Sequence, residues 1–327
     1  METDAYPNSL VDAIRTYSDP AVANAAMAAM RWPEGVTCPR CGGLEHYTIK
    51  TRHAWQCKAC KRQFTVKVGS IMEDSPLSVD KWLIAMWQIV NDRNGISSYE
   101  IARSLDITQK SAWFMAHRIR HAMTAGSLEK LDGEVEVDQT FIGPDKRKMN
   151  AESLERFEAI PAGRERVIVQ TAVEREGRVR SRVIRDTARK TIHDTIRATV
   201  GPGSKLYTDD HKSYDRLAGY ERESVNHSEG QYRDGEAYTN TVEGSFSLFK
   251  RCVRGTWVAI SPAHTGRYLA EQDARYNVRK LKDGQRAAIV GGMVGGRRMT
   301  YARLTARRGG RGPQKGYDWR LARSARS

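Results

Sequence analysis

Alternating apolar and polar positions predict a group of strands in the middle of the chain. Residues 134–142 alternate, and the β-prone segments 166–173 and 179–184 are separated by a Glu-Gly pair. Residues 190–200 have the spacing of a helix, and a further strand follows at 205–209. Neighbouring strands, then a helix, then a strand predict a mixed α/β sheet whose first strands are joined as hairpins.

A second pattern, of about 100° per residue, predicts an amphipathic helix that Thr239 can cap. One stripe of this helix is apolar and is expected to be buried. The other face carries a carboxylate, Glu243, and two turns later a basic residue, Lys250. That pairing suits a metal ligand followed by a phosphate contact, although a simple solvated face has the same composition. The apolar stripe is Val242, Phe246, Phe249 and Val253, and the polar face is Asn240, Glu243, Ser247 and Lys250.

Helical periodicity also precedes the strands. An apolar stripe runs through 79–90, Ser97-Ser98 can cap a short helix that ends near Leu105, and another helix starts near Gln109. This spacing resembles a helix-turn-helix, in which the start of the second helix reaches base edges and later basic residues hold phosphates. A plain helical hairpin with a charged solvent face is the alternative. The residues expected to contact DNA are Gln109, Lys110, His117, Arg118 and Arg120, with His121 also available.

Four of the five cysteines form two Cys-X-X-Cys pairs, Cys38/Cys41 and Cys57/Cys60. Two such knuckles on facing hairpins can bring four thiolates to one closed tetrahedral site, so we expect one structural Zn²⁺ in a ribbon with short strands at 47–50, 54–56 and 64–66. Redox use is disfavoured because a redox motif normally needs one pair. Unrelated free thiols are the other alternative.

The net positive charge of the chain predicts an anionic partner. The 327 residues carry a net charge of +15 with a pI of about 9.7, and residues 297–327 hold ten Lys or Arg against one acid. Nucleic acid is therefore the expected partner, and a membrane is not, because no apolar run approaches the roughly 20 residues of a spanning helix. The cysteine pattern and the missing signal peptide indicate a cytoplasmic, nucleoid-associated protein.

Three acids carry the candidate chemistry. Asp138 and Asp209 each follow an apolar β-prone segment, and Glu243 lies on the amphipathic helix. Folding can bring the three to one site for Mg²⁺ (or Mn²⁺), which prefers oxygen ligands, and two such ions serve phosphodiester chemistry. Asp210 is the alternative to Asp209. Only one of the two is expected to reach the metals, because adjacent residues of a strand point to opposite faces.

Together these residues resemble the bacterial insertion-sequence DDE transposases that carry an N-terminal zinc ribbon, whose core is RNase H-like. The resemblance implies a catalytic triad of Asp138, Asp209 and Glu243 with Asn240 as an accessory residue. Two departures are Gln139, where members often have Glu, and Tyr238, where they often have His. The matching segments are 31–41, 137–143, 207–209, 227–232, 239–243 through the basic pair Lys250-Arg251, which is expected to contact DNA, and 275–279.

The expected function is that of a transposase which binds double-stranded DNA at terminal inverted repeats, cleaves it and transfers the strand, working as a homodimer or larger assembly. A catalytically silent DNA-binding regulator and an RNase H-like nuclease or resolvase are the alternatives. The predicted organisation is a helical lead-in (1–34), the zinc ribbon (35–72), the helix-turn-helix region (76–128), the RNase H-like domain (131–283) and a basic flexible tail (284–327).

Overall fold

The computed structural model describes residues 6–124, 129–158, 166–175, 177–225, 240–258 and 260–305. The chain divides into two compact units. The ribbon unit comprises 1–92, 96–126 and 281–327, and the sheet unit comprises 93–95 and 127–280.

The sheet unit is built on five strands in the order β6-β5-β4-β7-β8. The first three pair antiparallel, and β7 and β8 run parallel to β4. This confirms the predicted mixed sheet and the RNase H-like class of core. The strands are β4 (Glu134–Ile142), β5 (Val167–Glu174), β6 (Val179–Ile184), β7 (Lys205–Asp209) and β8 (Glu221–Val225).

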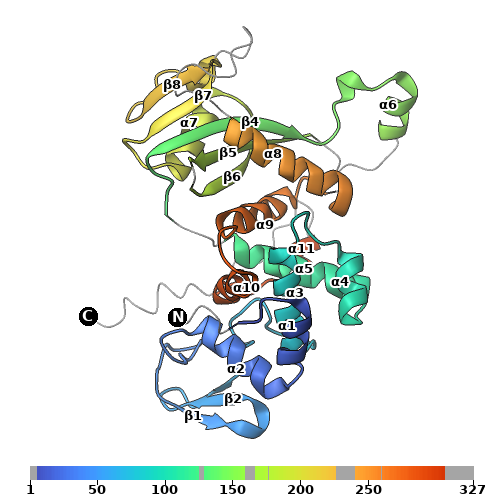
Figure 1. Ribbon diagram of the computed structural model, residues 1–327, viewed down its shortest axis with the longest axis vertical. Helices are drawn as coiled ribbons and strands as arrows, with labels where there is room; N and C mark the ends of the chain where they lie inside the picture. Colours follow the sequence, from blue (N-terminus) through green and yellow to red (C-terminus); the bar gives the residue numbers. More distant parts are fainter. Residues whose placement is uncertain are drawn as a thin grey trace. The chain divides into compact units, whose positions relative to one another are not determined.

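Alternation along β4 sends its side chains to two helical layers, on opposite faces of the sheet (Figure 1). Val135 and Val137 pack with Ile192 and Ile196 of α7 (Arg189–Thr199). Ile142 instead joins the cluster of α8 (Asn240–Cys252), the π-helical turn η5 (Val253–Trp257) and α9 (Thr265–Asn277). The sheet is therefore covered on both faces, as a core of this size requires.

Helix α9 also covers the outer edge of β6. The Asp273 carboxylate accepts hydrogen bonds from the Ser181 N–H at 2.7 Å and the Ser181 hydroxyl at 2.8 Å. One turn later, Asn277 pairs with both the N–H and the carbonyl of Val179. An unpaired strand edge is a template for aggregation, and these side chains satisfy it. The connection between β4 and β5 carries η2 (Lys146–Lys148) and α6 (Ala151–Glu158).

The ribbon unit joins a three-stranded antiparallel sheet to a set of helices. The two helices predicted around the turn at 106–108 are present, and a capping box between Ser97 and Glu100 begins the first of them. The elements are α1 (Leu10–Tyr17), α2 (Pro20–Arg31), β1 (His46–Ile49), η1 (Lys50–Arg52), β2 (Ala54–Cys57), β3 (Gln63–Phe64), α3 (Val79–Asn91), α4 (Ser98–Leu105) and α5 (Gln109–Met123).

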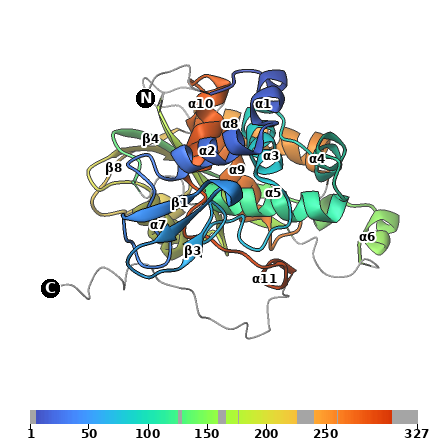
Figure 2. The ribbon, with the colours of Figure 1, turned by 90° about the horizontal axis from the view of Figure 1, so that it is seen from below.

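The C-terminal segment completes this unit. Helix α10 (Asp283–Gly292) lies beside α2 and α3 (Figure 2), and the Gly284 N–H donates to the Asn8 side chain, 276 residues earlier. The chain then bridges Ser70 through Gly295 and reaches α11 (Tyr301–Thr305). The prediction of a flexible tail from 284 was therefore wrong up to 305. Its glycines allow close packing rather than flexibility, and 306–327 lie outside the described residues.

Gly284 gives a direct test of this packing. A Cβ at position 284 meets the backbone oxygens of Tyr6 at 2.6 Å and Pro7 at 2.8 Å, which cannot move as a side chain can. We expect Gly284→Ala to destabilise the ribbon unit by about 1–3 kcal/mol, measured by urea unfolding. Gly266→Ala is the matched control, because a Cβ there meets nothing within 4 Å and alanine favours the helix. Equal stability of both variants would contradict the close approach.

Candidate active site and zinc centre

Asp138 and Asp209 occupy equivalent positions on neighbouring parallel strands. The pairing of β4 with β7 runs from Glu134↔Lys205 to Glu136↔Tyr207, and each aspartate lies two residues beyond its last paired residue. Residues in register on parallel strands share a face of the sheet, and neighbouring strands are about 4.8 Å apart. The two predicted aspartates thus point to the same face of the sheet, Asp138 from the middle of β4 and Asp209 from the last residue of β7.

Tyr214 lies within electrostatic reach of both carboxylates. Burial raises the pKa of this tyrosine well above its usual value, and the negative charges of Asp138 and Asp209 raise it further. Burial also raises the pKa of Asp209 itself. The Oδ1 of Asp138 accepts the backbone N–H of Gln139 at 2.6 Å, and the Oδ1 of Asp209 accepts that of His211 at 3.3 Å. Each carboxylate therefore accepts a hydrogen bond from the backbone close to it in sequence.

The structure separates the two aspartates from their neighbours in sequence. Asp209 is the last residue of β7 and is half-buried, whereas Asp210 follows the strand and is exposed. Gln139 points to the α7 face, opposite Asp138, and its Nε2 donates to the Tyr214 hydroxyl at 2.6 Å. This amide therefore contacts the α7 layer rather than the face with the acids. Tyr238 lies outside the described residues.

The helix with the third acid is attached to the same face of the sheet. Helix α8 begins at Asn240, and the Glu136 carboxylate of β4 accepts the backbone N–H groups of Thr241 at 2.9 Å and Val242 at 3.0 Å. Glu136 is two residues before Asp138 and so shares its face. Asn240 and Glu243 are both exposed on this first turn. Sequence reasoning gave Glu136 no role, although the alternation of β4 already placed it beside Asp138.

The three acids share this face but do not converge tightly. Within the residues that the structure describes, the four cysteines alone form a group of three or more potential metal ligands whose atoms all lie within 4.8 Å of one another. Further along α8, Lys250 is half-buried near the Phe246 ring and Arg251 is exposed. The assignment of these two to DNA contacts stays a prediction.

Burial corrects the predicted DNA contacts of α5. Arg118 is 5% exposed, and its guanidinium donates to the backbone carbonyls of Met299 at 3.0 Å and Glu73 at 2.6 Å. His117, which packs against the Trp113 ring, and Arg120 are buried as well. The prediction that these three basic residues face DNA was wrong, because the helix packs within the unit and backbone carbonyls of Glu73 and Met299 take the Arg118 donors.

The first turn of α5 keeps its predicted candidates. Lys110 is exposed, with its ammonium 4.9 Å from the Tyr301 ring centre. Gln109 is half-buried and donates to the Ser98 hydroxyl at 2.9 Å. A role of these two residues in DNA binding stays a prediction.

The four predicted zinc ligands meet in the ribbon. The Sγ atoms of Cys38 and Cys60 are 3.8 Å apart and those of Cys41 and Cys57 are 3.6 Å apart. A tetrahedral site with Zn–S bonds of about 2.3 Å has sulfurs about 3.8 Å apart, so the cluster fits Zn²⁺. The backbone N–H of Cys60 lowers the pKa of Cys57 to about 7, which favours the ligating thiolate.

Aromatic rings support this cluster from one side. Trp32, Trp55 and Phe64 pack together, with Trp55 and Phe64 stacked at 5.7 Å between ring centres. Arg31 lies over the Trp32 ring and donates to the Val66 carbonyl at 2.6 Å. A ribbon this small has little other core, which makes metal binding the main source of its stability.

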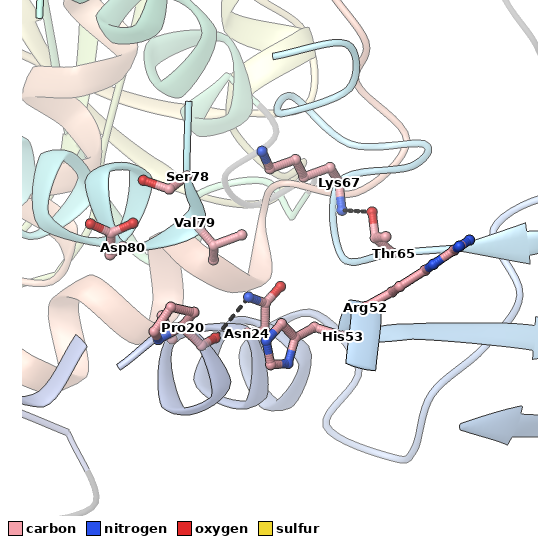
Figure 3. Close-up of a pocket in the computed structure, with 10 residues that line it drawn as sticks. Pro20, Asn24, Arg52, His53, Thr65, Lys67, Ser78, Val79 and Asp80 are labelled. Atoms are coloured by element: carbon pink, nitrogen blue, oxygen red, sulfur yellow. Dashed lines mark hydrogen bonds between the residues drawn. The ribbon is translucent and has the colours of Figure 1, made fainter. Parts of the chain in front are cut away.

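The ribbon unit also contains a hollow of about 270 Å³ between α2, the ribbon and the start of α3 (Figure 3). Two of its polar side chains are used within the protein: Lys67 donates to the carbonyls of Ser75 and Leu77, and Asn24 donates to the Pro20 carbonyl. None of the predicted site residues lines it. We therefore assign the hollow no ligand.

Comparison with known proteins finds matches for both the sheet with the three acids and the zinc ribbon. Residues 130–277 match the ISXO2-like transposase domain, and residues 18–63 match the transposase zinc-ribbon domain. The chain belongs to the ISXO2-like DDE transposases with an N-terminal zinc ribbon. The chain is also 25% identical over 254 residues to an uncharacterised protein in transposable element ISH50 of Halobacterium salinarum, an alignment that covers 73% of this chain and 84% of the relative.

Membership of the ISXO2-like transposases fits the chemistry of the two centres. A DDE domain implies transposase catalysis, DNA binding and divalent metals, and the four-cysteine cluster is consistent with structural zinc. The ISH50 relative comes from an archaeon, so the similarity is not confined to bacteria. Among the described residues, the helices are all too short or too polar to cross a membrane.

Proposed function

We propose that this protein is the transposase of an insertion sequence, which recognises the terminal inverted repeats of its element, cleaves the DNA at its ends and joins them to a target. The observation that carries the proposal is the equivalent placement of Asp138 and Asp209 on neighbouring parallel strands, with α8 and its Glu243 anchored to the same face. Hydrolysis and strand transfer are both in-line displacements at phosphorus, so one such site serves both.

Asp138, Asp209 and Glu243 are the residues that would hold the metals, with Asn240 as an accessory residue. Their oxygen donors suit Mg²⁺ or Mn²⁺, and a pair of these ions activates the attacking oxygen and stabilises the leaving one. The protein positions the acids: β4 and β7 fix two of them in register, and α8 supplies the third from across the same face.

Substrate binding is assigned to both units. In the ribbon unit, the zinc ribbon and the exposed start of α5 with Gln109 and Lys110 are proposed to bind the inverted repeats. In the sheet unit, Lys250 and Arg251 are proposed to contact phosphates near the acids. Pairing two element ends requires at least a dimer in the working complex.

The test uses purified full-length protein and DNA that carries the ends of its own element. With Mg²⁺ or Mn²⁺ we expect cleavage at the ends followed by joining to a target duplex. Binding without cleavage would identify a catalytically silent regulator, and cleavage without joining would identify a nuclease or resolvase. Either outcome would overturn the proposed function.

A further inference from the structure

Glu136 is a fully buried carboxylate that the proposed catalytic chemistry does not use. It is 0% exposed in the middle of β4. Besides the two backbone N–H groups of α8, its Oε1 accepts the Thr241 hydroxyl at 2.9 Å. Three donors from two consecutive residues of one helix thus converge on a single side chain of the strand that carries Asp138.

The charge of Glu136 is balanced within the sheet. The Nε of Arg175 lies 3.6 Å from Oε1, and the Arg175 guanidinium stacks 3.6 Å from the centre of the Tyr207 ring. Arg175 also pairs with the half-exposed Glu134 at 2.9 Å. A buried carboxylate is costly unless it is paired and hydrogen-bonded, and Glu136 has both kinds of partner.

A carboxylate at this place also suits the helix. The first backbone N–H groups of a helix have no partner inside it, and the helix dipole favours negative charge there. Glu136 satisfies these groups from the neighbouring strand. The helix is thereby fixed in translation along β4, because sliding it by one residue breaks three hydrogen bonds at once.

We propose that Glu136 is a positioning residue that fixes the distance between Glu243 and Asp138 for metal binding, an inference that rests on the proposed function. Asp138 follows Glu136 by two residues on β4, and Glu243 follows Thr241 by two residues on α8. One carboxylate thus ties the strand that carries Asp138 to the first turn of the helix that carries Glu243. Groups behind the metal ligands typically alter metal affinity 10–100-fold when they are lost.

The experiment compares Glu136→Gln with Glu134→Gln in the full-length, zinc-loaded protein. Both remove one negative charge from β4 and one partner of Arg175, but only the first touches α8. We expect the Thr241 and Val242 amides to exchange hydrogen at least about 10-fold faster in Glu136→Gln alone. We also expect its Mn²⁺ affinity, followed by electron paramagnetic resonance, to fall about 10-fold or more.

A second pair of variants, at Thr241, tests the same contact in case Glu136→Gln does not fold. Thr241→Val removes one donor and is expected to weaken Mn²⁺ binding in the same direction, whereas Thr241→Ser keeps the hydroxyl and should bind as the wild type does. Equal exchange and equal Mn²⁺ affinity of the Glu136 and Glu134 variants would overturn the positioning role. Absence of Mn²⁺ binding by the wild type would instead overturn the proposed metal site. Hydrogen exchange of the α8 amides does not depend on metal, so the two failures can be told apart.

Discussion

Replacing Asp138 with asparagine is expected to reduce cleavage of element ends at least about 1000-fold while leaving DNA affinity within a few-fold of the wild type. The substitution keeps the size of the side chain and removes the charge. Stabilisation of phosphoryl transfer by a bound metal contributes several kcal/mol, and about 4 kcal/mol corresponds to this factor. Cleavage and joining are to be measured on labelled DNA ends, and affinity by a shift assay at fixed salt.

The matched control is Asp210→Asn. Asp210 lies directly after Asp209 and is exposed beyond the end of β7, so its loss changes the local charge equally without removing a residue of the predicted triad. We expect it to keep most of the activity, while Asp209→Asn behaves like Asp138→Asn. Full activity of Asp138→Asn, or loss of activity only in Asp210→Asn, would contradict the assignment.

Loss of zinc is expected to have the largest effect on folding. Binding of a structural Zn²⁺ contributes on the order of 10 kcal/mol in small domains, and the ribbon has few other means of stability. Cys41→Ser is the most informative variant for testing zinc loss, because Cys41 is exposed and the substitution itself disturbs little packing. Elemental analysis should find one zinc per wild-type chain and well under one in Cys41→Ser, and proteolysis of the variant should begin within residues 32–70.

Cys252→Ser is the control for this experiment. Cys252 is the fifth cysteine, buried in the sheet unit beside Gln272, and it is not part of the four-cysteine group. The same chemical change at this position should leave one zinc per chain and an intact ribbon. A wild-type protein that folds with no bound metal would contradict the zinc centre.

The parts of the fold that depend on local pattern could be predicted from the sequence. Alternation in 134–142 and the helical stripe from Val242 to Phe249 follow from periods of 2 and about 3.6 residues, and the cysteine spacing is equally local. These patterns placed Asp138 within one strand and Asp209 at the end of another, each after an apolar segment, and set Glu243 on the polar side of a helix. The parallel register that aligns the two aspartates could not be read in this way, because it is set by non-local pairing.

The errors arise from contacts between distant segments. The pattern of α5 alone predicts that Arg118 faces solvent, but its guanidinium donates to the carbonyl of Glu73, 45 residues earlier, and to that of Met299, 181 residues later. Likewise, a run rich in glycine and arginine is typical of a flexible tail, yet Gly284 fits against the backbone of Tyr6 and Pro7. Glu136 was overlooked for the same reason, since its partners on α8 are more than 100 residues away.

The ribbon unit draws its parts from both ends of the chain, and this has a consequence for biosynthesis. The ribosome makes the zinc ribbon early, but α10 and the segment that binds Arg118 only after the whole sheet unit has emerged. A nascent chain therefore holds the ribbon unit without its last layer until the sheet unit has been made. Chains that stop within the sheet unit never acquire that layer, so such fragments are expected to have a less stable ribbon unit than the longer chain.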